Sequence, residues 1–265
     1  MPAPLEPIAR LSRDLRAAAI ALTDTEARYL VDAYYIMQED RKRTRAQERA
    51  LGENKEPHSV ITWLAEQSKT LEQQITRALD VYTQAHLVGD WLRGVFGVGP
   101  VLAAGLLAHI DIKQASTVGH IWSYAGIAGD GQKPWQKGQK RPWNPTLKTI
   151  CWRLSDSFVK FSNNQKCFYG QIYRQRKALE VEKNEHCEFK HIAEARLRRD
   201  RERGRSSVER PFHEAGKLSP GHLELRARRY AVKLFWRTCT TNGTGAPLAR
   251  SRPSLIRLRI SGTRI

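Results

Sequence analysis

Arg93-Gly-Val-Phe-Gly-Val-Gly-Pro-Val-Leu-Ala-Ala-Gly-Leu-Leu-Ala-His-Ile110 is the stretch of this chain that decides its fold. A short apolar turn over residues 96–99 leads directly into a segment with apolar residues at helical spacing. Pro100 suits the first position of a helix, where its missing N–H costs no hydrogen bond. This pattern predicts a helix-hairpin-helix.

The turn of this hairpin has the chemistry of an anion site. Glycines at positions 97 and 99 allow a tight turn and a close approach to the backbone, since neither carries a Cβ atom. The N–H groups at a helix start lack partners within the helix and lie at the positive end of its dipole. Gly97, Val98 and Gly99 are therefore predicted to bind a nucleic-acid phosphate through backbone amides. The alternative is a helix-turn-helix corner in which these residues only permit a close crossing.

The composition favours a polyanionic partner. The 265 residues include 45 Lys and Arg against 27 Asp and Glu, which gives a net charge of +18 and a pI near 10.1. Such an excess is typical of proteins that bind DNA, RNA or an acidic membrane surface. No segment approaches the roughly 18 consecutive apolar residues of a membrane span, and the N-terminus lacks the pattern of a signal peptide. The four scattered cysteines form no Cys-x-x-Cys pair, so we expect a reduced, cytoplasmic protein.

The N-terminal third reads as a long helical hairpin. Thr23-Asp-Thr-Glu26 is a capping-box pattern that opens a helical run ending near Leu51-Gly52. A second helical segment opens at Glu56-Pro57-His58-Ser59 and continues with apolar residues three, four and seven apart. Residues 1–90 are therefore predicted to form an arm or oligomerisation hairpin, and we expect a homo-oligomer.

Helical patterns continue through the rest of the chain, so the predicted fold class is all-α. Residues 91–163 are predicted to form the helix-hairpin-helix domain. Within it, one helix starts at Ala115-Ser-Thr117 and another at Asn144-Pro145. Residues 164–236 are predicted to hold one long charged helix over 165–203 and a closing helix through Trp236. Residues 237–265 have six arginines, no lysine and no acidic residue, and are predicted to form a disordered basic tail.

A basic segment follows the hairpin. Between Gly131 and Ser155 there are six basic residues and no acidic ones, with three tryptophans interleaved. Lysine and arginine neutralise phosphates, and an exposed tryptophan can stack on unpaired bases. Lys137, Lys140 and Arg141 are predicted to bind nucleic acid, with Arg93 and Lys113 supplying further charge, whereas Trp152 is predicted to face the core. The alternative is that the lysines only keep a mobile loop in solution.

The order of these central blocks resembles a known family. The blocks are the segment 97–110, then Ile121-Trp-Ser-Tyr-Ala-Gly-Ile127, then the basic loop and helix over 140–158. They are similar to the C-terminal transposase domain of the insertion-sequence transposases that carry a DEDD RNase H-like domain, the bridge-RNA-guided recombinases. The helix Tyr230-Ala-Val-Lys-Leu-Phe235 fits the last helix of that family less firmly. The resemblance implies DNA binding during transposition or recombination.

Two features of that family are absent from the positions of this sequence where the resemblance would place them. The first is the acidic half, which needs carboxylates that converge on a divalent metal from a strand-rich core. The acidic residues of the N-terminal third lie in helical patterns and are interpreted as surface charges: Asp14, Asp24, Glu26, Asp32, Glu39 and Asp40. The second is the serine nucleophile that the resemblance implies in the loop after the Ala-Gly block, because residues 126–142 contain no serine. Ser123 and Ser155 are the nearest, and both are predicted to be ordinary helical polar residues.

No other constellation in the sequence predicts a cofactor or catalysis. His186, Cys187 and His191 are close in sequence, but zinc prefers four ligands in short paired spacings, so no metal site is predicted. His109 and His120 flank the hairpin and are interpreted as buried, hydrogen-bonded side chains, because no nucleophile or carboxylate partner is evident.

Together these observations predict a sequence-tolerant protein of a mobile element or prophage that binds duplex DNA through its helix-hairpin-helix. No catalytic residue is assigned, so enzymatic activity stays open. One alternative is an active transposase or recombinase subunit that receives catalytic groups from another chain. Another is an RNA-binding or assembly protein that works through the arginine-rich segment 194–203 and the tail.

Overall fold

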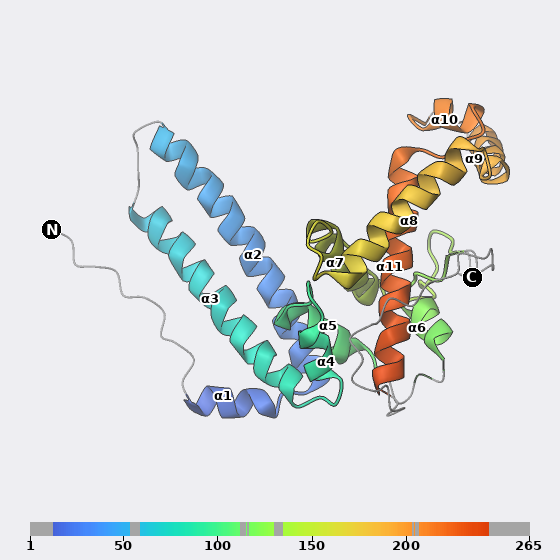
Figure 1. The fold of residues 1–265 in the computed structure, drawn as a ribbon. Coiled ribbons are helices and arrows are strands. Elements are labelled where there is room, and N and C mark those ends of the chain that lie inside the picture. Colours follow the sequence, from blue (N-terminus) through green and yellow to red (C-terminus); the bar gives the residue numbers. More distant parts are fainter. Residues whose placement is uncertain are drawn as a thin grey trace.

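The computed structural model describes residues 13–53, 59–111, 115, 117–129, 135–202, 204 and 207–243. All regular secondary structure within these ranges is helical, so the predicted all-α class is confirmed. Figure 1 shows a long hairpin on one side and a group of crossing helices on the other. The helices of the described part are α1 (Arg13–Ile20), α2 (Asp24–Glu53), α3 (Ser59–Gln84), α4 (Gly89–Gly94), α5 (Pro100–His109), α6 (Val118–Tyr124), α7 (Pro145–Lys160), α8 (Phe168–Glu185), α9 (Lys190–Glu202), α10 (Arg210–Glu214) and α11 (Pro220–Gly243).

The predicted N-terminal hairpin is formed by α2 and α3, which lie side by side along their length (Figure 1). The capping box starts α2 as expected. The Thr23 N–H donates to Glu26 Oε2 at 2.8 Å, and the Glu26 N–H donates to Thr23 Oγ1 at 3.3 Å. At the base of the hairpin, α5 packs against both α2 and α3. The hairpin therefore holds the helix that follows the glycine turn.

One hydrophobic core joins the base of the hairpin to the central helices. Val31 and Leu79 belong to the same buried cluster as Leu106 of α5 and Leu154 of α7. Phe235 of α11 occupies its middle, in ring contact with four other aromatic side chains of the described part: Trp91, Phe158, Tyr169 and Trp236. The elements that carry the glycine turn are thus fixed by packing from several helices.

The predicted start and inner face of α7 are confirmed. The Asn144 side chain caps the helix by accepting a hydrogen bond from the Leu147 N–H at 3.0 Å, and Pro145 occupies the first turn. The five residues predicted for its apolar face are all buried: Leu147, Ile150, Cys151, Leu154 and Phe158. This packing holds α7 against α5, α8 and α11.

The prediction of one long helix over 165–203 is wrong, because the chain breaks between α8 and α9. Cys187 adopts a left-handed backbone with φ of 54°. Its N–H donates to the Asn184 carbonyl, and the Glu188 N–H donates to the Lys183 carbonyl, which is the hydrogen-bond pattern of a Schellman motif. Glycine usually occupies this position, so a cysteine there does not mark the helix end in the sequence.

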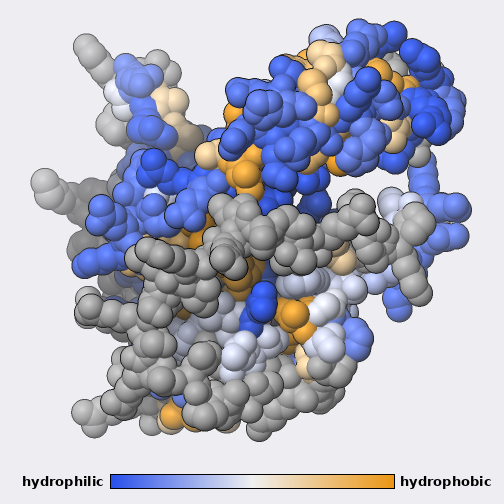
Figure 2. All heavy atoms as spheres, turned by 45° about the vertical axis from the view of Figure 1, so that its right-hand side comes forward, coloured by the Kyte–Doolittle hydropathy of each residue, from blue (hydrophilic) through white to orange (hydrophobic). Residues whose placement is uncertain are grey.

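The lobe beyond this break is attached through a buried ion pair and a small second core. Glu180 of α8 is only 1% exposed and binds Arg176 at 2.6 Å and Arg226 of α11 at 2.7 Å. Phe189, Leu218 and Leu223 form a separate apolar cluster next to it. Figure 2 shows that this lobe is covered mainly by hydrophilic side chains. Its attachment to α11 brings α9 and α10 close to the N-terminal end of that helix.

The predicted end of the closing helix at Trp236 is also wrong. Helix α11 continues to Gly243, and Cys239 is buried in the core, so packing favours helix beyond the point where the composition changes. The predicted disordered tail is therefore helical over 237–243, and residues 244–265 lie outside the described residues. Among the described helices, none combines the length and the apolar character needed to cross a membrane.

Candidate nucleic-acid interface

The predicted hairpin is present as α4, a turn over 95–99 and α5. The Val98 N–H donates to the Val95 carbonyl at 2.9 Å and closes the turn. Gly99 precedes α5 in an extended conformation without a side-chain cap, and Pro100 occupies the first turn. The Ala103 N–H makes the first helical bond, to the Gly99 carbonyl at 3.0 Å. The backbone N–H groups that precede Ala103 at the start of α5 have no acceptor within the helix, as is usual for the first turn of a helix.

The two glycines of the turn have different surroundings. Gly97 has φ of +94°, and a Cβ atom there would lie 3.3 Å from Ser157 Oγ of α7. The Ser157 hydroxyl donates to the Gly97 carbonyl at 2.6 Å, so this residue is fixed against α7. At Gly99 the backbone is ordinary, and a Cβ atom would meet nothing within 4 Å. Open space therefore lies in front of Gly99, directly at the start of α5.

Val98 plays a different part from the two glycines. Its side chain is buried in the core, and its amide is used in the turn. The predicted amide donation by Val98 is thus wrong for this conformation, because the turn already satisfies that N–H. Val98 anchors the hairpin, and any contact with an anion falls to the groups on either side of it.

Arg93 lies on α4 and is engaged in ion pairs. Its Nε lies 2.9 Å from Asp80 Oδ1 of α3, and its NH1 lies 3.7 Å from Asp90 Oδ1. Two carboxylates therefore compensate the charge that the sequence assigned to a phosphate. The predicted Lys113 lies outside the described residues.

The basic loop exposes its three predicted side chains. Lys137, Lys140 and Arg141 are all exposed. The indole of Trp135 donates to the Gln139 carbonyl at 2.7 Å, and the Arg141 guanidinium lies 5.4 Å from the centre of the Trp135 ring. The tryptophan thus organises the turn from which the three cations project.

A second cluster of cations connects this loop to α11. Lys148 lies over the Trp143 ring at 4.5 Å. Burial lowers the pKa of Lys148, and the nearby charges of Arg229 and Arg141 lower it further. Arg229 was not singled out from the sequence, because α11 reads as an ordinary charged helix. The fold brings it next to Lys148 and Arg141, which lie between 80 and 90 positions away in the chain.

The prediction that Trp152 faces the core is wrong, since its side chain is 54% exposed. Its neighbours Cys151 and Leu154 carry the buried face of α7, and Trp152 points away from them. It lines a cavity together with residues of α9 and α11. Arg196 belongs to the arginine-rich segment 194–203 of the RNA-binding alternative, whereas His222 and Arg228 were not singled out from the sequence. Only the fold brings these side chains together.

The acidic residues of the hairpin are spread along α2 and mostly occupied by structural partners. Asp24 accepts a hydrogen bond from the Tyr82 hydroxyl at 2.7 Å, and Asp40 accepts one from Ser68 at 3.1 Å. Glu39 pairs with Lys42 at 2.8 Å. Within the described residues, no three His, Cys, Asp or Glu side chains are grouped closely enough to hold a metal ion.

The two serines nearest the family's expected nucleophile lie on helices. Ser123 belongs to α6, and Ser155 belongs to α7, where its hydroxyl donates to the Trp152 carbonyl at 2.6 Å. This local hydrogen bond is typical of a helical serine.

The two histidines that flank the hairpin differ in their surroundings. His109, the last residue of α5, is half-buried, and its Nδ1 lies 3.4 Å from the side-chain nitrogen of Asn144. Burial lowers the pKa of His109. His120 of α6 is exposed, so its predicted burial is wrong.

No family model, no curated protein and no solved structure matches this chain. The geometry of its own residues is therefore the basis for assigning a function.

Proposed function

We propose that this chain is a DNA-binding protein of a mobile element or prophage, with residues 91–163 acting as a domain that resembles the C-terminal transposase domain. The observation that carries the proposal is the open space before Gly99 at the start of α5. A phosphate oxygen can approach unpaired amides there without meeting a Cβ atom, and the helix dipole favours its charge.

The exposed cations of the loop support the same proposal. Lys137, Lys140 and Arg141 project from one turn and supply charge for neighbouring phosphates. Because backbone amides and lysines contact phosphates rather than base edges, the binding is expected to tolerate many sequences. The α2–α3 hairpin is proposed to join two copies of the chain.

The test is the binding of a labelled duplex across a salt series by wild type and Gly99→Val. A Cβ atom at this position meets nothing within 4 Å, so valine fills the open space with little disturbance of the fold, and we expect affinity to fall about tenfold at every salt concentration. Replacing Lys137, Lys140 and Arg141 by alanine should instead flatten the salt dependence, by about 0.9 in the logarithmic slope for each phosphate that is no longer neutralised.

Gly94→Val is the matched control, since this glycine is also exposed and has nothing within 4 Å of a Cβ atom. Gly97 is unsuitable as a test, because its positive φ and its contact with Ser157 make any substitution a folding defect. Circular dichroism checks that each variant is folded. Equal affinities for wild type, Gly94→Val and Gly99→Val would show that the hairpin is not the site.

A further inference from the structure

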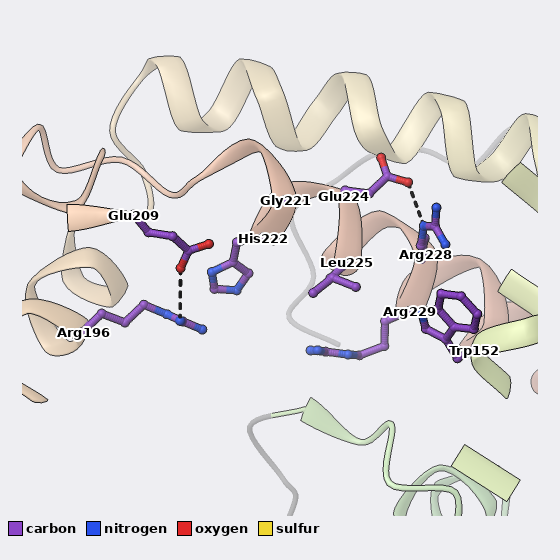
Figure 3. A pocket seen from close by; sticks show the side chains of 9 residues that line it. All are labelled: Trp152, Arg196, Glu209, Gly221, His222, Glu224, Leu225, Arg228 and Arg229. Atoms are coloured by element: carbon purple, nitrogen blue, oxygen red, sulfur yellow. Dashed lines mark hydrogen bonds and ion pairs between the residues drawn. The ribbon is translucent and has the colours of Figure 1, made fainter. Parts of the chain in front are cut away.

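A cavity of about 560 Å³ opens between α7, the middle of α9, the residue before α10 and the first turns of α11. This volume lies within the range of small-ligand sites, roughly 300–1,000 Å³. Figure 3 shows the side chains that line it, which come from segments far apart in the sequence. They are Trp152, Arg196, Glu209, Gly221, His222, Glu224, Leu225, Arg228 and Arg229.

Two guanidinium groups point into this cavity from opposite sides. In Figure 3, Arg196 extends from one wall and Arg229 from the other, and both end in the space next to His222. Arg228 is turned elsewhere, because it binds Glu224 at 2.7 Å and Asp156 at 3.4 Å. The centre of the cavity therefore lies between two cations, the arrangement that suits an anion with several oxygen atoms.

The two carboxylates of the lining are already satisfied by the protein. Desolvation acts to raise the pKa of Glu224, but hydrogen bonds from Lys177, Tyr173 and Arg228 outweigh it and lower the pKa to about 2. Glu209 accepts a hydrogen bond from the Ser219 hydroxyl, which holds its pKa below the usual value. Its contact with Arg196 is long, at 4.0 Å. Both carboxylates stay ionised at neutral pH, so three arginines against two glutamates leave the lining with an excess of one positive charge.

His222 adds a neutral polar group to the wall. Burial and the charges of Arg196, Arg226 and Arg229 lower its pKa to about 4, so the imidazole is uncharged at neutral pH. Its Nδ1 is buried without a hydrogen-bond partner among the described residues. This atom is shielded from solvent, so His222 contributes an uncharged ring to the cavity lining rather than an accessible hydrogen-bonding position.

Trp152 and Leu225 give the cavity an apolar edge. Their side chains are 54% and 49% exposed, although both residues are large and apolar. Trp152 lies beside Arg229 at one end of the cavity in Figure 3. An exposed indole next to guanidinium groups combines a stacking surface for a base with charges for its phosphate.

The cavity is also connected to the basic loop. Arg229 comes close to Gly129, where a Cβ atom would lie 3.7 Å from its NH1. The charges of Arg229 and Arg141 both lower the pKa of Lys148, so these three cations lie close together. A polyanionic chain that leaves the loop therefore meets a continuous series of positive charges on its way to Arg196.

We propose that this cavity binds one nucleotide of a single-stranded nucleic-acid segment, with its base stacked on Trp152 and its phosphate between Arg196 and Arg229. The proposal rests on the proposed function, because it places an unpaired strand next to the duplex held by the hairpin. A single strand is required, since the base faces of a duplex are covered by their neighbours.

The test is the binding of a fluorescent single-stranded oligothymidylate and of an abasic strand of equal length. We expect Trp152→Ala to weaken oligothymidylate binding about tenfold and to leave the abasic strand unaffected. Trp152→Phe should restore most of the affinity, because it keeps an aromatic surface. Arg229→Gln should weaken the binding of both strands. The control is Arg174→Gln, which changes an exposed cation on α8 and should weaken the binding of either strand only by the loss of one charge.

A direct reading of stacking comes from tryptophan fluorescence. Oligothymidylate should quench the emission of wild type more than that of Trp152→Ala. The proposal is overturned if Trp152→Ala binds both strands with the affinity of wild type. It is also overturned if polyglutamate displaces bound oligothymidylate as effectively as the abasic strand does, because the cavity would then be a general anion site. Gly99→Val separates the two proposals, because it should weaken duplex binding and leave the Trp152 effect on single strands unchanged.

Discussion

The left-handed backbone at Gly97 and the empty space at Gly99 describe two kinds of glycine within one turn. At position 97 the fold itself requires glycine, because the backbone is left-handed and the residue lies against Ser157. At Gly99 neither argument applies, because the backbone there is ordinary for an N-cap residue and an added Cβ atom would meet nothing within 4 Å. This contrast makes Gly99 the more informative position for a binding study.

Cys187 holds a glycine's place in the Schellman motif that ends α8. A residue with a Cβ atom in this conformation costs about 1 kcal/mol, so Cys187→Gly is expected to raise the free energy of unfolding by roughly that amount. The measurement is chemical denaturation followed by circular dichroism. Cys187→Ala, which removes the thiol but keeps the strain, should show no such gain. A Cys187→Gly protein no more stable than wild type would contradict the expectation.

His222 should make the fold sensitive to mild acid. Its pKa is about 4 in the folded chain, against an ordinary value of 6.5, so the unfolded chain binds the proton more readily between these values. Its contribution is complete above pH 6.5 and decreases as the pH falls towards 4. After allowance for solvent screening the loss is about 1–2 kcal/mol.

Denaturation midpoints measured from pH 7 to pH 4 test this expectation. His222→Gln should lose less stability than wild type over that interval, because glutamine takes up no proton. His191→Gln, which changes an exposed histidine of α9, should follow wild type. Parallel pH profiles for all three proteins would show that burial of His222 does not govern the acid response.

At the scale of elements, local sequence rules located the helix starts. The capping box at Thr23, the Asn144-Pro145 start and the glycine turn each use contacts between near neighbours, which a sequence displays directly. The break at Cys187 was missed because no glycine or proline marks it. The core prediction for Trp152 failed because its side of α7 lines the open cavity, and which side of a helix is covered depends on long-range packing.

The hairpin of α2 and α3 carries exposed apolar side chains along its length. Tyr29 and Ile36 lie seven residues apart on one face of α2, and they are 73% and 63% exposed. A second copy of the chain would cover them, so we expect Ile36→Glu to convert a dimer into a monomer. Sedimentation equilibrium gives the mass directly. Ala46→Glu, at another exposed position of α2, is the control, and a wild type that is monomeric at high concentration would refute self-association through this hairpin.

Over the whole molecule, charge and packing are distributed differently. The net charge of +18 is carried largely by side chains at the surface, whereas a single main core runs from the base of the hairpin to α11. The sequence displayed the charge in full, but it could not show which cations would be neutralised. Arg93 is paired with Asp80 and Asp90, whereas Arg141, Lys148 and Arg229 are gathered in one place. Only the fold shows which cations lie beside carboxylates and which lie beside other cations.

The hydrogen bond from Ser157 to Gly97 ties the glycine turn to α7, the helix that also carries Trp152, so α7 fixes the distance between the two proposed contacts. Ser157 and Trp152 belong to the same helix, and their positions differ by about 7.5 Å along its axis. Because the helix is rigid, the turn and the indole cannot change this spacing independently. For a strand held at both places, this spacing would set the number of nucleotides between the two contacts, at about 3.4 Å for each stacked nucleotide. The place where a duplex opens would then be set by the protein's geometry, without any base being read.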